Sequence, residues 1–211
     1  MMKHFGRTMI GAALGGVITV ATAQVGTKPA DPQAMKAGEE RAVNLCSTCH
    51  GPRGISTSPE FPILAAQRAG YIEAQLEAFR TKTREEKIAH DFMWGIAYNL
   101  DDAMIKNVAL YYSTQPPPPG RPGDPALVSK GKELFDKGAP GRGIPACATC
   151  HGADAQGVAD FPRLAGQHAK YVVSQLNYIQ SLVRKAPVMH GIVKDLTPEE
   201  MQAIAAYVQS K

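Results

Sequence analysis

Two copies of one short pattern, Cys-x-x-Cys-His, lie in opposite halves of this chain and constrain its fold more than any other feature. The first copy pairs Cys46 and Cys49 before His50, and the second pairs Cys147 and Cys150 before His151. The pattern is that of covalent haem attachment: one turn of backbone presents both thiols to the porphyrin vinyl groups, and the histidine lies under the iron. Because the chain has 4 cysteines in all, both pairs are used. The sequence therefore predicts two covalently bound haem c groups, each with a proximal histidine.

Three other uses of paired cysteines fit the pattern less well. One zinc ion shared by both pairs would need them about 15–20 residues apart, whereas most of a domain separates Cys49 from Cys147. A thioredoxin-like redox pair needs no adjacent histidine and sits in a βαβ pattern that this sequence lacks. Two disulfides would leave the matching positions of His50 and His151 unexplained.

Residues 1–23 have the pattern of a secretory signal peptide: a basic start, an apolar run over 9–20, and a small-residue site ending at Ala23. We expect cleavage after Ala23, export to the periplasm and a mature chain that starts at Gln24. An uncleaved anchor is the alternative, but the apolar run is too short for a comfortable membrane span. No other stretch is long and apolar enough, so the mature chain is expected to lack a transmembrane segment. Peripheral association with a membrane stays open.

The charge of the chain argues against a nucleic-acid partner. Its formal net charge is +4, and removing the signal peptide lowers it further, whereas a nucleic-acid-binding protein carries a basic stripe and a larger excess of Lys and Arg. The second half is mildly more basic than the first, a difference that can orient a docking partner.

The rest of the chain is a duplication. Both halves carry the pattern Phe-Pro-x-Leu-Ala-x-Gln, over 61–67 and 161–167, and four further residues recur at matching positions: Tyr71 and Tyr171, Gln75 and Gln175, Leu76 and Leu176, Arg84 and Arg184. A proline-rich segment separates the copies, and proline prevents a helix or a central strand there. We predict domain 1 over 24–115, a linker over 116–125 and domain 2 over 126–211.

Each half has the periodicity of a small helical domain. Apolar residues recur at helical spacing and no alternating β-branched run predicts a sheet, so the fold class is all-α, with each domain wrapped on one haem. The last helix of the second half has a capping box over Thr197 to Glu200 and a proline at its first position. The predicted helices cover 34–45, 69–80, 127–137 and 169–182, together with one after Asp101 and one after Thr197.

A haem iron that carries electrons needs a sixth ligand, and methionine is the usual one. The repeat selects Met93 and Met189, because Met-Trp-Gly-Ile aligns with Met-His-Gly-Ile in what reads as a loop before the last helix. The other candidates are weaker: two methionines lie at helical core spacing, and three histidines have no matching partner (Met104, Met201, His90, His168, His190).

These residues together resemble the cytochrome c4 family, two-haem periplasmic cytochromes with two tandem class I cytochrome c domains. The resemblance covers nearly all of the mature chain. It implies His/Met ligation of both irons, a pseudo-twofold arrangement of the domains, and haem propionates that meet at their interface. It also implies that the carbonyls of Pro62 and Pro162 accept a hydrogen bond from the proximal histidines, and that Arg84 and Arg184 lie near the haem surface.

The function expected from these features is electron transfer without bond chemistry, because six-coordinate iron has no open position for a substrate. The resemblance implies shuttling of single electrons between respiratory redox proteins, toward a terminal oxidase or another acceptor. The alternative is a dihaem cytochrome subunit of a periplasmic dehydrogenase, such as a flavocytochrome. A dihaem redox enzyme is the remaining possibility, and methionines at both equivalent positions argue against it.

Overall fold

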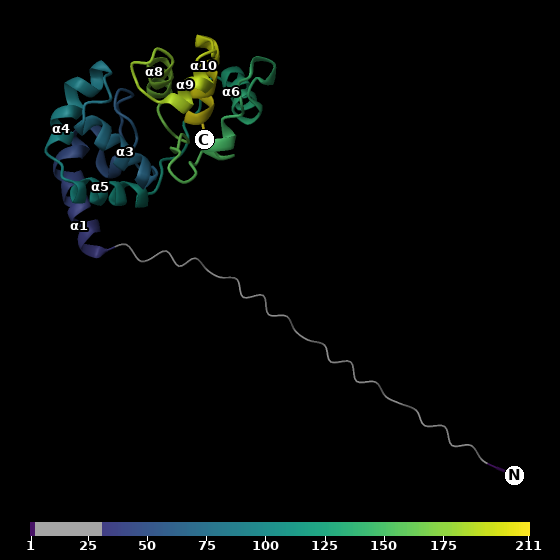
Figure 1. Cartoon of the computed structure of the whole chain (residues 1–211), viewed down its shortest axis with the longest axis horizontal. Coiled ribbons are helices and arrows are strands. Elements are labelled where there is room, and N and C mark those ends of the chain that lie inside the picture. Colours follow the sequence, from purple (N-terminus) through teal and green to yellow (C-terminus); the bar gives the residue numbers. More distant parts are fainter. Residues whose placement is uncertain (3–30) are drawn as a thin grey trace.

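The computed structural model describes residues 1–2 and 31–211, so nearly all of the predicted signal peptide lies outside the described residues. Two helical halves lie side by side, joined by one extended crossing of the chain (Figure 1). The described part contains no strand, only two isolated bridge pairs, which confirms the all-α prediction. Among the described residues, no helix has the length and apolarity needed to cross a bilayer.

Both halves repeat the same order of elements: a first helix, the Cys-x-x-Cys-His turn, a middle helix, a short helical segment at the methionine, and a last helix. The first half contains α1 (Pro32–Arg41), a π-helical turn (Ala42–Cys46), α2 (Ser47–His50), a 3₁₀ turn (Pro52–Gly54), α3 (Ala69–Arg80), a second π-helical turn (Ala89–Met93), α4 (Trp94–Tyr98) and α5 (Asp102–Thr114). The second half contains α6 (Pro125–Lys137), a 3₁₀ turn (Pro140–Arg142), α7 (Ala148–His151), α8 (Ala169–Gln180), α9 (Pro187–Val193) and α10 (Pro198–Gln209).

Local sequence signals set most helix ends. The carboxylates of Asp31, Asp101 and Asp124 accept backbone N–H groups at the starts of α1, α5 and α6, at 2.9, 2.7 and 2.9 Å. Thr197 and Glu200 form the predicted capping box of α10. The predicted helix over 69–80 is confirmed as α3, whereas α8 ends two residues before the predicted boundary of 182.

The first and last helices of each half pack against each other, α1 on α5 and α6 on α10. Glycines lie where the backbones approach most closely. A Cβ added to Gly38 would lie 2.1 Å from the carbonyl oxygen of Asn107, and one added to Gly131 would lie 1.9 Å from that of Ala203. Only glycine permits these crossings, which fix the helix that leads into each cysteine motif.

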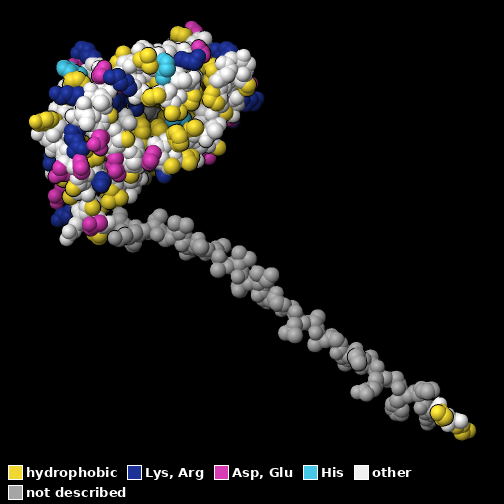
Figure 2. Space-filling view, in the orientation of Figure 1, with side chains coloured by type: hydrophobic (Ala, Val, Ile, Leu, Met, Phe, Trp, Pro, Cys, Tyr) yellow, Lys and Arg dark blue, Asp and Glu magenta, His cyan; other side chains and the backbone are white. Residues whose placement is uncertain are grey.

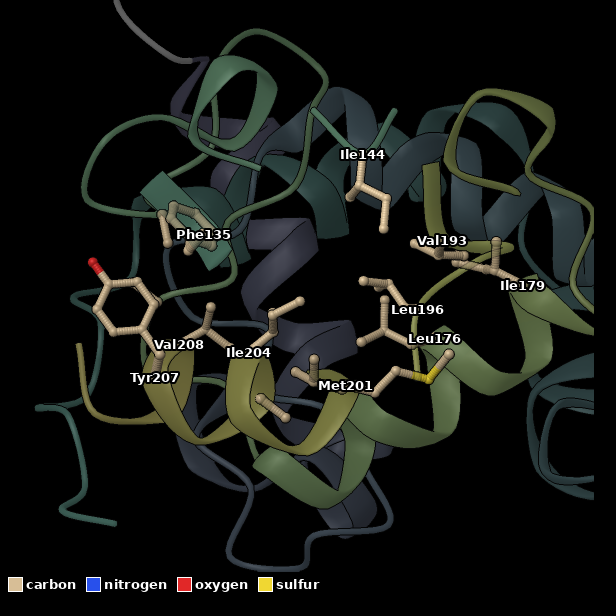
Figure 3. Packing of buried hydrophobic residues seen from close by; sticks show 14 residues of the cluster. Phe135, Ile144, Leu176, Ile179, Val193, Leu196, Met201, Ile204, Tyr207 and Val208 are labelled. Carbon is tan, nitrogen blue, oxygen red and sulfur yellow. The ribbon is translucent and has the colours of Figure 1, made fainter. Parts of the chain in front are cut away.

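Each half has its own apolar core. In the second half the buried ring of Phe135 packs on Tyr207, with 5.3 Å between ring centroids, and Ile204 and Val208 of α10 lie beside it (Figure 3). On the far side of the same cluster, the side chain of Ile144 reaches toward Leu196 and borders the cavity described below.

The proline-rich segment between the halves is extended and lies against the second half. Residues 116–124 form no helix, in keeping with the prediction from their prolines. The backbone N–H of Arg121 donates to the carbonyl of Gln209 at 2.9 Å. Helix α6 begins at Pro125, the last residue assigned to the linker from sequence.

Candidate haem sites

The Cys-x-x-Cys-His patterns form one short helical turn in each half, α2 and α7. No disulfide joins any two of the four cysteines, and in the described part no three His, Cys, Asp or Glu side chains cluster as a metal site would require. Before haem attachment, burial raises the pKa of the Cys46 thiol and raises that of Cys147 to about 11.

A second feature of the motif is the orientation of its histidine. His50 Nδ1 lies 2.9 Å from the carbonyl oxygen of Pro62, and His151 Nδ1 lies 3.0 Å from that of Pro162. These contacts are those that the family resemblance implied. Because a carbonyl only accepts, Nδ1 carries the proton and Nε2 keeps its lone pair. Burial lowers the pKa of both rings, which the hydrogen bond only partly offsets, and this keeps the imidazoles neutral.

Both histidines line one apolar cavity of about 630 Å³ that continues from one half into the other. In Figure 2 hydrophobic side chains gather around a hollow in the face that is shown. His151 Nε2 is buried and has no hydrogen-bond partner. A buried nitrogen lone pair without a partner is costly in a protein interior but suits an iron ligand. The residues present therefore fit a haem in each half.

The structure places the four candidate methionines in two different environments. Met93 and Met189 line the cavity, and Met104 and Met201 do not. Met201 is 1% exposed within the core of the second half. The prediction that the first two lie in loops is wrong, because Met93 ends a π-helical turn and Met189 lies in α9. Pro187 at the first position of α9 starts that helix, a signal that sequence reasoning missed.

The other three histidines that the structure describes do not line the cavity. His90 is exposed and pairs with Asp91. His190 Nδ1 lies 3.0 Å from the carbonyl of Ile179 and ties α9 to α8. His168 is buried where the halves meet, with Nε2 3.0 Å from the carbonyl of Ser56.

The cavity is bordered by buried polar groups at the contact between the halves. Arg84 donates to Gln75 at 3.1 Å and to Gln175 at 2.9 Å, and Arg184 donates to the same two side chains at 2.8 and 2.6 Å. Glu86, which sequence reasoning did not single out, is fully buried and pairs with Arg84. The crossed contacts give the interface approximate twofold symmetry, and the recurrence of Gln75 and Arg84 was the signal for it.

Comparison with known proteins identifies the family. Residues 128–211 match the family model described as cytochrome c. A protein named cytochrome c4 from Thiocapsa roseopersicina is 39% identical over 85% of this chain and 92% of its own length. The crystal structure of reduced recombinant cytochrome c4 from Pseudomonas stutzeri is 31% identical, with a TM-score of 0.76, over 83% of this chain and 97% of that one.

A further relative is named thiosulfate dehydrogenase electron acceptor, from Thiomonas intermedia. It is 32% identical over 79% of this chain and 78% of its own length. With both cysteine motifs, both oriented histidines and a fold of two class I cytochrome domains, the chain belongs to the cytochrome c4 family of dihaem electron-transfer proteins.

Proposed function

We propose that His50 and Met93 hold the iron of one haem, that His151 and Met189 hold the other, and that the protein carries single electrons between exported redox proteins. Cys46 with Cys49, and Cys147 with Cys150, form the thioether bonds. The haem supplies the reversible exchange of one electron. The chain supplies orientation, an apolar surround and closed axial positions, which favour outer-sphere transfer over bond chemistry.

One observation carries this proposal: in each half, an imidazole whose Nδ1 contacts a proline carbonyl and the methionine at the matching repeat position line the same cavity. Thioether sulfur is soft and neutral and suits iron in both oxidation states.

The ligands are tested by substitution. Oxidised protein is expected to show the weak sulfur-to-iron band at the red end of the visible spectrum. Met93→Ala and Met189→Ala each remove one contribution to it and lower the potential of one haem, because the thioether favours ferrous iron. The matched controls Met104→Ala and Met201→Ala leave the band intact. Loss of the band in a control variant would show that the repeat alignment selects the wrong residues.

The closed axial positions are tested with carbon monoxide. Reduced native protein is expected to bind carbon monoxide slowly or not at all, and to show no thiosulfate-oxidising or peroxidase turnover by itself. Rapid stoichiometric binding at one haem together with turnover would favour the enzyme alternative.

We place the final acceptor among terminal oxidases, following the family resemblance. The relative named thiosulfate dehydrogenase electron acceptor favours a second role, as the cytochrome partner of a periplasmic dehydrogenase. Stopped-flow reduction of the protein by a thiosulfate dehydrogenase, followed by its reoxidation by an oxidase preparation, distinguishes the two. Fast reduction in the first step supports the dehydrogenase role, whereas reduction only by a respiratory donor supports the oxidase role.

Export is part of the same proposal, since a signal peptide over 1–23 delivers the mature chain to the periplasm, where haem attachment would follow. N-terminal sequencing of the purified protein is expected to begin at Gln24. A start at Met1 would contradict cleavage and support an anchored form.

A further inference from the structure

The glutamines that end the two Phe-Pro-x-Leu-Ala-x-Gln stretches reach into the opposite half. Gln167 accepts from the N–H of Ile63 and donates to its carbonyl, both at 2.9 Å. Gln67 accepts from the N–H of Arg163 at 2.7 Å and donates to its carbonyl at 3.0 Å. Both side chains are only 6% exposed. Each glutamine therefore pairs with the backbone of the other half as a neighbouring strand would.

The amides are held in a single orientation. Each glutamine oxygen also accepts from the N–H of the next residue, Arg68 or His168, at 3.0 Å in both cases. Because that N–H can only donate, the oxygen and nitrogen of the amide cannot exchange places without losing bonds.

The peptide groups that the glutamines contact are those that orient the proximal histidines. The N–H of Ile63 belongs to the same peptide unit as the Pro62 carbonyl, which accepts from His50 Nδ1 at 2.9 Å. A continuous chain of hydrogen bonds thus runs from Gln167 through one peptide group to His50. In the other direction, Gln67 reaches His151 through the Pro162 carbonyl, which lies 3.0 Å from that ring.

Hydrogen bonds in such a chain polarise one another. An acceptor on the peptide N–H makes the carbonyl of the same peptide a stronger acceptor, by about 10–30% per bond. A stronger acceptor on Nδ1 raises the basicity of the ring at Nε2. A more basic imidazole stabilises ferric over ferrous iron and so lowers the reduction potential.

We infer that Gln67 and Gln167 are crossed positioning residues: each tunes the proximal histidine of the opposite half, so that each iron site is set partly by the other domain. This inference rests on the proposed ligation by His50 and His151. A residue that only stabilised the contact between the halves would affect both iron sites equally. The inferred role differs, because each glutamine acts on one site.

The test measures the potential of each site in Gln167→Met and Gln67→Met. Methionine nearly matches glutamine in volume, but it gives the peptide N–H at most a weak thioether acceptor and has no donor. A redox titration followed by NMR reads the ligand methyl signals of Met93 and Met189 separately, with Met93→Ala and Met189→Ala assigning them.

We expect Gln167→Met to raise the ratio of reduced to oxidised iron at the His50 site by up to about twofold at fixed electrode potential, the effect of losing 10–30% of a hydrogen bond between neutral groups. Its effect on the His151 site is expected to be much smaller. Gln67→Met gives the reverse pattern. The control Lys170→Ala removes an exposed ion pair with Glu60 across the same interface and is expected to leave both ratios unchanged.

Three results would overturn the inference. The ratio of reduced to oxidised iron could change mainly at the site in the glutamine's own half, change equally at both sites, or change at neither. Should Gln167→Met fail to fold, Gln167→Glu keeps an oxygen for the Ile63 N–H. It is expected to lower the reduced fraction at the His50 site, and a rise there, or no change, contradicts the inference. Failure of the proposed ligation is recognised separately, because native protein would then lack the two methionine methyl signals before any glutamine is changed.

Discussion

The contact between α6 and α10 offers the sharpest quantitative prediction, the effect of Gly131→Ala. The added Cβ would lie 1.9 Å from the carbonyl oxygen of Ala203 and 2.8 Å from the Cβ of Tyr207. Real Cβ atoms essentially never come within 3.0 Å of such atoms. Neither atom can rotate away, because the carbonyl oxygen of Ala203 belongs to the backbone and the Cβ of Tyr207 is bonded directly to it. The two helices must therefore move apart to accept the added Cβ.

Two opposing terms set the magnitude. Alanine in place of glycine favours the helix by about 1 kcal/mol. Overpacking costs about 1–3 kcal/mol, and the upper end applies because a whole helix must move. The net loss is about 2 kcal/mol, which lowers the melting temperature by about 4–8 °C for a chain of this size.

The measurement is thermal and urea unfolding followed by circular dichroism on the haem-loaded protein. Gly191→Ala is the matched control, because its Cβ meets nothing within 4 Å, and it is expected to be neutral or stabilising by up to about 1 kcal/mol. Gly38→Ala, 2.1 Å from the carbonyl of Asn107, should repeat the loss in the first half. If Gly131→Ala is as stable as the native protein, the close crossing is not what requires glycine there.

Two further predictions concern buried groups at the contact between the halves. Glu86→Ala leaves the buried guanidinium of Arg84 without its ionic partner. In urea unfolding we expect this variant to be less stable than the native protein by about 3 kcal/mol. The control Lys87→Ala removes an exposed ion pair and is expected to cost less than about 1 kcal/mol. Burial and the charge of Arg121 hold the pKa of His168 below its usual range. As the pH falls below about 6.5, His168 therefore gains a proton in the unfolded chain but not in the folded chain. The native protein is therefore expected to lose stability between pH 8 and 5 more steeply than His168→Gln, and equal slopes for the two proteins would show that His168 does not contribute.

Local signals and the internal repeat account for what sequence reasoning found. Helical spacing gave α3 at its observed bounds, and proline with a capping box gave the start of α10. The repeat distinguished Met93 and Met189 from the core methionines, and of the methionines that the structure describes only these two line the cavity.

The glutamine contacts between the halves were not predicted, for a physical reason. The pairs Gln67–Arg163 and Gln167–Ile63 lie 96 and 104 residues apart, so no local periodicity reports them. Glu86 lies in a segment without helical pattern, where a charged residue is expected to face solvent. Its burial depends on Arg84, and its counterpart in the other half is Ala186, so the repeat gave no signal either.

The two proposed iron sites are alike at the histidine and differ at the methionine. The histidine contacts to Pro62 and Pro162 agree within 0.1 Å, at 2.9 and 3.0 Å. The residues that follow the methionines differ: Trp94 Nε1 donates to the carbonyl of Arg84 at 2.8 Å, whereas the His190 ring contacts the carbonyl of Ile179 at 3.0 Å. The hydrogen bonds that lead from Gln67 and Gln167 to the two histidines are nearly identical. We therefore expect them to shift both reduction potentials in the same direction, without making the two potentials differ. We therefore expect a difference between the two potentials to arise from the unequal methionine segments and from the buried carboxylate of Glu86 beside Arg84.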